Sequence, residues 1–433
     1  MQQISVVAML TGGVVLLSGY ILPWLFRYQV LLGSNRVWSP DPKFADLKNT
    51  CMALYPLQLQ GCEKFKLVGR NIFAACVGDW TKRRMWFPPM GIFDEKNEVL
   101  GIIRDTLYKI DIQTRKLTEL SLQNFPAETD FCVHGMDVIE TTPGGFSMFL
   151  VNHRREGSVI EKFKYTDDSR DVFHVSTFDG TDIGLYNPND IFALPVSNTD
   201  EESTESAFFV TNDQYFRRSK IGRTLEKYFR LPTGSLFYHS ASTGFHRVKR
   251  GISNANGITG FQNEEFRHLN PHLANVIFVA SILDGMVTAY RYEPGRVIEK
   301  NGLVKLKDYS FDFVMDNLAI SRDSRWLYLA GHGQPAKLGD HWETPGKVSS
   351  ASISYRMSLT ELGEYFGNKG EIGESRVERI VVDKNGVLGN ASTTAVGDDQ
   401  INKYWISGLT FKGIIECDLY SADREQEAID QEI

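Results

Sequence analysis

Five positions recur along this chain at a near-constant spacing, and four of them carry a carboxylate or carboxamide that suits a metal ion. Successive members lie roughly 55 to 70 residues apart, a period that indicates one structural unit for each. Carboxylate and carboxamide oxygens are the ligands that a hard cation such as calcium prefers. Taken singly, each Asn or Asp also fits an Asx turn or cap, so the repetition carries the metal hypothesis. The positions are Glu63, His134-Gly135-Met136, Asn189-Asp190, Asn256 and Asp316-Asn317.

Two histidines would add proton transfer to such a site. His134 lies just before a predicted strand at 145–153, and His153 ends that strand. On neighbouring strands, one imidazole would position the other as a general base; the alternative is two buried histidines with satisfied hydrogen bonds. Zinc-binding Cys-x-x-Cys and His-Glu-x-x-His patterns are absent, as are a Gly-x-Ser-x-Gly elbow, a Walker loop and a dinucleotide fingerprint.

The elements that would position these residues are short β-strands. Aromatic residues make up 12% of the chain and 37 glycines punctuate it, a mixture of strand formers and turn residues. Asp284-Gly285 predicts a type I′ hairpin within 275–292. One helix is predicted at 219–230, where Ile221, Leu225 and Phe229 recur every four residues before Pro232.

The strand pattern predicts an all-β fold. No β-α-β alternation is visible, which leaves a sandwich, a barrel or a propeller. The region from about residue 45 to 420 holds about six units of the spacing, so six four-stranded blades fit. The inner ends of propeller blades converge on a central channel, so residues hundreds of positions apart would share one ion.

Both ends of the chain differ from the predicted β domain at 49–420. Residues 1–27 include an uncharged run from Ile4 to Phe26, long enough to cross a bilayer, and we interpret it as a signal anchor, with cleavage as the alternative. Residues 28–48 form a connector, and the acidic tail at 421–433 is predicted to be disordered. Asn390 begins a glycosylation sequon. The net charge of −7 argues against nucleic-acid binding.

Several motifs together resemble the serum paraoxonase/arylesterase family over the region from Cys51 to Leu419. The resemblance implies a calcium-dependent, six-bladed β-propeller hydrolase whose first and last strands are closed by a Cys51–Cys417 disulfide. Five buried thiols would be the alternative for the cysteines. The motifs are Gly61-Cys62-Glu63, Val133-His134-Gly135-Met136-Asp137, Val151-Asn152-His153, Pro188-Asn189-Asp190-Ile191, residues 210–216, residues 254–258, Asp316-Asn317-Leu318 and Cys417-Asp418-Leu419.

The resemblance also implies residue roles. His134 and His153 match the family's histidine dyad, with Asp316 as an alternative base. Two pocket residues follow from the resemblance as well: Trp80 lies near a family position that carries an aromatic residue on a mobile active-site loop, and His332 lies near a histidine on the pocket wall. The residues that match the ligands of the catalytic calcium are Glu63, Asn189, Asn256, Asp316 and Asn317.

Lys64 departs from the family pattern. The family usually has an Asp after the calcium-binding Glu, where it helps to bind a second, structural calcium. The other parts of that second site, Asp190 and the main-chain carbonyl of Met136, remain. An ammonium group repels a divalent cation but can take its place, so we expect Lys64 to pair with Asp190 and one calcium to bind.

The sequence therefore predicts a calcium-dependent hydrolase of small-molecule esters or lactones. We expect it in the secretory pathway, either anchored to a membrane by its N-terminal segment and facing the lumen or extracellular space, or secreted. Two alternatives stay open. One is a non-enzymatic, membrane-anchored propeller that binds other molecules. The other is a propeller of the sugar-lactonase or strictosidine-synthase type, from which the His-Gly and closing-cysteine motifs point away.

Overall fold

The computed structural model describes residues 38–195, 207–269, 271–344, 347–361 and 375–420, with residues 13–15, 17–21 and 25 near the N-terminus. Most of the expected anchor at 1–27, part of the connector and the tail at 421–433 therefore lie outside the described residues. Within the described part of the chain, no helix has the length and apolar character needed to cross a membrane.

Strand sequences differ with distance from the centre of the fold. Every residue of β9 (Gly145–His153) and β17 (Val276–Ser281) is buried. Side-chain exposure varies along β11 (Asp171–Phe178), an outer strand of its half of the sheet. A strand with neighbours on both edges and on both faces has no solvent-facing side, which explains the continuous apolar runs in the sequence.

Three sheets consist of four consecutive antiparallel strands each. Their apolar faces pack on one another; one core cluster joins Phe278 of β17 to Leu329 of the next sheet. The first sheet contains β12 (Pro188–Ala193), β13 (Phe208–Asn212), β14 (Gly234–Ser240) and β15 (Gly244–Ile252). The second contains β16 (Ala255–Gly260), β17, β18 (Met286–Tyr292) and β19 (Leu303–Ser310). The third contains β20 (Val314–Ile320), β21 (Trp326–His332), β22 (Ser352–Ser358) and β23 (Val377–Asp383).

A fourth sheet joins the two ends of the β domain. β1 (Met52–Leu54) pairs antiparallel with β26 (Ile414–Asp418), next to β25 (Lys403–Gly408) and β24 (Ser392–Asp398). The Cys51–Cys417 disulfide covalently fixes this closure, as predicted. A second disulfide, Cys62–Cys76, was not predicted, and Cys132 is a buried free thiol.

The remaining large sheet has eight strands, where two separate four-stranded sheets were expected. Two antiparallel halves are joined where β7 and β11 pair in parallel over three residues. The fold is thus all-β and propeller-like, but strand pairing does not divide it into six separate sheets. One half contains β2 (Lys64–Val68), β3 (Asn71–Cys76), β6 (Thr106–Asp111) and β7 (Leu117–Gln123). The other contains β8 (Val133–Thr142), β9, β10 (Ser158–Thr166) and β11.

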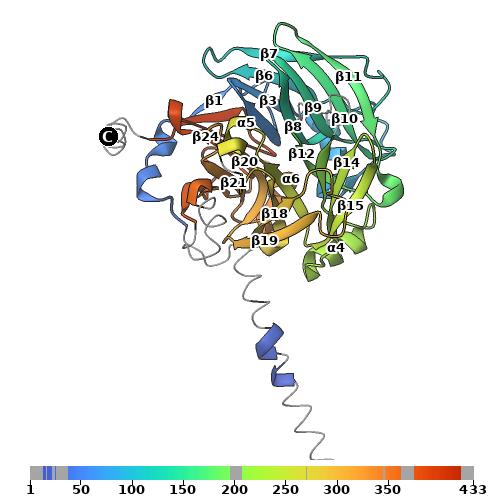
Figure 1. Ribbon diagram of the computed structural model, residues 1–433, viewed down its shortest axis with the longest axis vertical. Helices are drawn as coiled ribbons and strands as arrows, with labels where there is room; N and C mark the ends of the chain where they lie inside the picture. The colour runs from blue at the N-terminus through green and yellow to red at the C-terminus, as the bar shows by residue number, and fades with distance from the viewer. Residues whose placement is uncertain are drawn as a thin grey trace, which may run out of the picture.

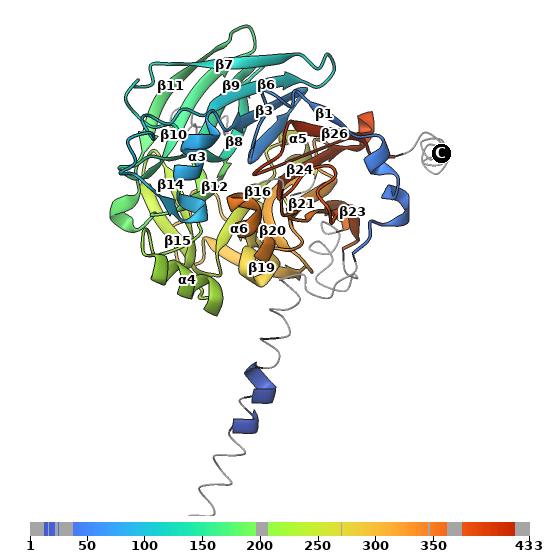
Figure 2. The same cartoon turned by 180° about the vertical axis from the view of Figure 1, so that it is seen from behind.

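The innermost strands follow one another around a common centre. β2 contacts β8, and contacts continue through β12, β16, β20 and β24 back to β2. Figures 1 and 2 show the sheets side by side around this centre, with the blue β2–β3 region beside the red C-terminal strands. The start of each inner strand therefore faces the starts of the others.

Short helices occupy loops between the strands. They are α3 (Trp80–Met85), α4 (Lys220–Phe229), α5 (Glu264–Leu269) and α6 (Ala336–Glu343), and a small hairpin of β4 (Trp86–Phe87) and β5 (Ile92–Phe93) follows α3. The predicted helix is confirmed as α4, capped by Ser219. The predicted hairpin at 275–292 also exists, but Ile282–Asp284 forms a 3-10 turn in place of the type I′ turn.

Candidate active site

Four inner strands carry the same irregularity, a β-bulge at their polar residues. In β12, Asn189 and Asp190 together stand opposite the single residue Thr211 of β13. In a regular strand, consecutive side chains point to opposite faces. A bulge changes this direction, which explains how two consecutive polar residues can both point toward the centre of the ring of inner strands. β8, β16 and β20 repeat the pattern at His134-Gly135, Asn256-Gly257 and Asp316-Asn317.

Two glycines let neighbouring bulges pack backbone to backbone. A Cβ atom at Gly135 would lie 2.1 Å from the carbonyl oxygen of Asn189. At Gly257 it would lie 2.5 Å from the carbonyl oxygen of Asp316. Any side chain at either position would push the adjacent inner strand away. The glycines therefore keep the polar side chains of successive strands around one point.

Glu63, immediately before β2, lies at this point. Its Oε1 accepts a hydrogen bond from Asn317 Nδ2 at 2.6 Å and lies 3.7 Å from His134 Nε2. Its backbone carbonyl accepts hydrogen bonds from the hydroxyls of Thr393 and Thr394, at 2.5 and 2.9 Å. The carboxylate is therefore held in one place, although it is buried and no lysine or arginine among the described residues pairs with it directly.

The donor set fits a hard cation on two observations. Glu63 Oε2 and Asn256 Oδ1 are buried without a hydrogen-bond partner, which is costly unless something else satisfies them. Burial, together with the negative charge of Asp316, raises the pKa of Glu63 well above its usual value. A divalent ion would relieve both penalties. The described residues hold no cluster of three or more His, Cys, Asp or Glu in a metal-binding arrangement, because this donor set mixes carboxylates with amides.

Asn189 is also buried on the β12 bulge, whereas Asn317 is oriented differently from the other expected ligands. The Asn317 amide directs its nitrogen to Glu63, and its oxygen lies 3.3 Å from Lys64 Nζ. Binding a cation through the Asn317 oxygen would require the amide to turn over.

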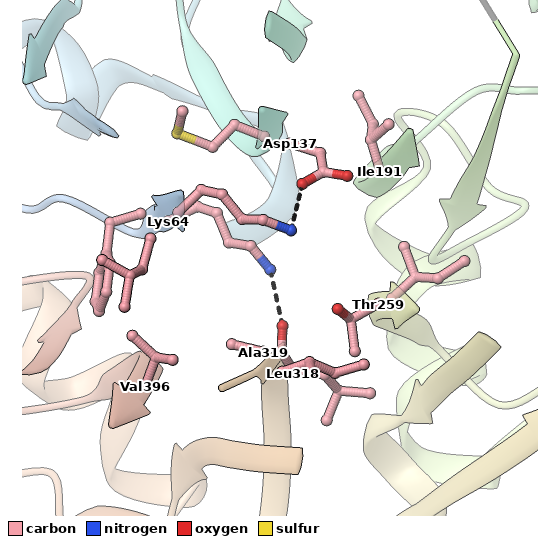
Figure 3. A pocket seen from close by; sticks show the side chains of 13 residues that line it. Lys64, Asp137, Ile191, Thr259, Leu318, Ala319 and Val396 are labelled. Carbon is pink, nitrogen blue, oxygen red and sulfur yellow. Dashed lines mark hydrogen bonds and ion pairs between the residues drawn. The ribbon is translucent and has the colours of Figure 1, made fainter. Parts of the chain in front are cut away.

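Lys64 forms the expected ion pair with Asp190. Its ammonium, almost fully buried, donates to Asp190 Oδ2 at 2.8 Å and to the carbonyl oxygen of Leu318 at 3.4 Å. Desolvation raises the pKa of Asp190 despite this pairing. Figure 3 shows Lys64 reaching across a small cavity. The cavity has a volume of about 20 Å³, and Met136 also lines it. A lysine nitrogen thus occupies an oxygen-lined position at the centre of the ring.

His134 and His153 lie side by side on β8 and β9, as predicted, with ring centroids 5.3 Å apart. His153 Nδ1 lies 2.8 Å from Ser158 Oγ, whereas His134 Nδ1 and His153 Nε2 are buried without partners. Burial, with the charges of Arg83 and Lys64, lowers the pKa of His134 to about 3. Burial and His134 also lower the pKa of His153. Both imidazoles are therefore neutral, and each keeps one ring nitrogen without a hydrogen-bond partner.

His332 and Trp80 also lie beside this site. His332, at the end of β21, places Nε2 3.0 Å from Asp316 Oδ2. The Trp80 indole donates to Gln60 Oε1 at 3.0 Å, and its ring covers Gly61, where a Cβ atom would lie 2.8 Å from it. His332 thus contacts an expected ligand directly, and Trp80 covers the turn that carries Glu63.

Sequence reasoning missed Arg83, a buried guanidinium behind the histidines. It pairs with the Asp105 carboxylate, contacts the carbonyl oxygen of Val133 and lies 4.4 Å from the Phe87 ring centroid. Asp79, a residue type that is common at helix N-caps, is the one signal for α3 in the sequence. In the structure, Asp79 Oδ1 accepts a hydrogen bond from Thr81 N at 2.8 Å. The sequence does not signal that Arg83 turns inward from that helix.

The chain is similar to known hydrolases over most of its length. A family model described as Arylesterase matches residues 99–418. Serum paraoxonase/arylesterase 2 of Gallus gallus is 24% identical over 318 residues, 72% of this chain and 76% of that protein. Serum paraoxonase/arylesterase 1 of Homo sapiens is 21% identical over 291 residues, 67% of this chain and 69% of that protein.

Among solved structures, a luciferin-regenerating enzyme aligns with 85% of this chain and 94% of its own, with a TM-score of 0.46 and 12% identity. The family model, by comparison, matches well over half of the 433 residues at the level of sequence. The chain belongs to the arylesterase family, with the serum paraoxonase/arylesterases as relatives.

Proposed function

We propose that this protein is a calcium-dependent hydrolase of carboxylic esters, acting on aryl esters or lactones. Family membership supports ester or lactone hydrolysis at the level of the family. The observation that carries the calcium proposal is the pair of unpartnered buried oxygens, Glu63 Oε2 and Asn256 Oδ1, beside two neutral imidazoles.

A bound calcium ion would supply Lewis-acid polarisation of the substrate carbonyl and charge stabilisation for the oxyanion. The residues that would hold it are Glu63, Asn189, Asn256, Asp316 and, after its amide turns, Asn317. His134 is proposed to take the proton from the attacking water, with Asp316 as the alternative base. His153 would orient His134, since its own Nδ1 is held by Ser158.

We further propose that one calcium binds and that Lys64 serves in place of a second. The ammonium already contacts Asp190, and a divalent ion there would meet its charge at close range. We also count the two halves of the eight-stranded sheet as separate blades, which makes a six-bladed propeller with its six inner strands in a closed ring.

A secretory location, with glycosylation at Asn390 and an N-terminal membrane anchor, belongs to the same proposal. Two disulfides are typical of proteins that fold in oxidising compartments. Asn390 is partly exposed, and its Oδ1 accepts from Ser350 N at 2.9 Å.

Kinetics of matched variants test this function. Because His134→Gln removes the proposed base but no ligand, we expect kcat/KM for phenyl acetate or a lactone to fall by about 10² to 10⁴ with calcium binding retained. Asp316→Asn should weaken calcium binding and turnover together. The control is His246→Gln, the same change on outer strand β15, which should leave both unchanged.

Two results would contradict the proposal in different ways. Full activity of His134→Gln would show that His134 is not the base that accepts the proton from water, but it would not contradict the proposed calcium site. No turnover of any aryl ester or lactone by calcium-loaded, folded wild type would favour the non-enzymatic binding propeller.

A further inference from the structure

Three aromatic side chains, here called the aromatic roof, cover the candidate active site. They are Trp80, Phe87 and Trp342. The Phe87 ring meets the His134 ring at 5.4 Å in a T-shaped contact. Trp342 stacks on Phe87 with centroids 5.6 Å apart and planes only 13° from parallel. The edge of Trp80 closes the stack at 6.0 Å from Trp342.

Beneath the roof, the site residues are almost fully buried in this conformation. Glu63 and His134 are each 4% exposed, and Asp316 is 6% exposed. An ester carbonyl must reach these groups for hydrolysis to occur. Part of the roof therefore has to move, and the two sides of the Phe87–Trp342 stack are not equally fixed.

Phe87 belongs to the firmly held side. It pairs within the β4–β5 hairpin, and the Arg83 guanidinium lies 4.4 Å from its ring centroid. The adjacent Trp86 indole donates to the carbonyl oxygen of His153 at 2.7 Å. Movement of Phe87 would therefore disturb the strand that carries the histidine.

Trp342 belongs to the weakly held side. It comes from α6, an eight-residue helix without a side-chain cap, whose only buried residues are His341 and Trp342. His341 ties α6 to the last sheet region, with Nε2 2.7 Å from Thr410 Oγ1. Elements with few buried contacts are the ones that open locally at low free-energy cost.

We infer that Trp342 is a specificity-determining residue: α6 lifts its indole from Phe87 to admit the ester, and the side chain at position 342 limits the size of the substrate group that then lies against Phe87. This inference rests on the proposed hydrolase function. The exposed Phe87 face would pack against an apolar acyl or aryl group, because aromatic faces bind such groups in offset-stacked geometry. The Trp342 indole, still attached to α6, would form the opposing wall.

Substrate size dependence tests the specificity part. The assay compares kcat/KM for p-nitrophenyl decanoate and p-nitrophenyl acetate, which share a leaving group and differ in acyl length. Trp342→Ala should raise the decanoate-to-acetate ratio about tenfold, since shape limits of apolar pockets have effects of this order. Trp342→Phe should stay near wild type. Lys337→Ala, an exposed change on the same helix, is the matched control.

Cys132 gives a readout of roof opening that does not depend on catalysis. Its thiol is fully buried in the same apolar cluster as Phe87 and Trp342. The other four cysteines are paired in disulfides, so a small thiosulfonate reagent reports Cys132 alone. Trp342→Ala should speed this labelling about tenfold in folded protein, and Trp342→Phe much less, because the stacked contact that keeps the cluster closed is lost.

The two readouts separate failure of this inference from failure of the proposed function. Acetate turnover in all variants with an unchanged size ratio would overturn the specificity role while leaving the hydrolase intact. Unchanged labelling of Cys132 in Trp342→Ala would overturn the gate. If no variant hydrolyses any ester, the proposed function and the specificity role fail, and the labelling rate alone decides whether Trp342 closes the roof.

Discussion

Lys64 and Glu63 are neighbours in the chain with opposite roles at the centre of the ring. Glu63 keeps one carboxylate oxygen unpartnered, whereas Lys64 neutralises Asp190. A fixed ammonium cannot leave its oxygen ligands as a dissociable ion does. The centre of the ring should therefore keep this contact in metal-free protein.

Removal of the Lys64 charge tests this view. Lys64→Met leaves Asp190 buried and unpaired, so the free energy of unfolding should fall by about 3 to 5 kcal/mol. The double variant Lys64→Met/Asp190→Asn should be less destabilised than Lys64→Met alone, because no bare charge remains. Denaturant unfolding in EDTA measures both values. A loss below about 1 kcal/mol in Lys64→Met would show that the pair does not hold the centre together.

At the residue scale, sequence reasoning located side chains that recur with the inner strands and missed those from irregular segments. Glu63, Asn256 and Asp316 were predicted because each recurs at the start of an inner strand. Arg83 and Trp342 come from short helices in loops of individual length, so no repeat marks them. Their burial depends on tertiary packing that residue spacing does not encode.

At the scale of elements, the repeated pattern of a polar pair before an apolar run corresponds to a β-bulge. The sequence showed the pattern but not the bulge, because the pairing of two residues with one becomes visible only when the partner strand is placed.

For helix α4, the sequence predicted the element correctly but for a reason that the structure does not support. Its existence was predicted from Ile221, Leu225 and Phe229, yet these side chains are exposed. The helix is held by its polar face, where Arg223 donates to the carbonyl oxygen of Pro88 and Glu226 accepts from Tyr215 N.

β1 is the element whose stability depends most on a covalent bond. It pairs with β26 over only three residues, next to the Cys51–Cys417 disulfide, whose cysteines are 366 residues apart. In the chain-entropy model, opening this loop by Cys51→Ala/Cys417→Ala should cost about 6 kcal/mol, against about 3 kcal/mol for Cys62→Ala/Cys76→Ala. The second pair, 14 residues apart, is the matched control.

Thermal unfolding with hydrogen exchange at β1 measures the effect of the two disulfides. Loss of protection should begin at β1 when the long disulfide is removed. Equal destabilisation by both double variants, with β1 still protected, would show that strand pairing alone closes the ring.

At the scale of the whole molecule, the all-β class, the family and the closing disulfide were predictable, whereas the sheet boundaries were not. The spacing of the repeats and the turn residues predict how many strands each unit contains. They do not predict that the outer strands β7 and β11 lie close enough to pair, which joins two units into one sheet. That contact depends on how far the 117–123 and 171–178 strands extend from the centre.

The closed ring supports the metal proposal, because the proposed ligands come from the turn before β2 and from the bulges of β12, β16 and β20. A calcium titration of metal-depleted protein, followed by phenyl acetate turnover, tests the central claim most directly. We predict no turnover in EDTA and recovery that saturates at one calcium per chain, because Lys64 occupies the neighbouring cation position. Turnover that persists without calcium, or that requires two equivalents, would contradict the account.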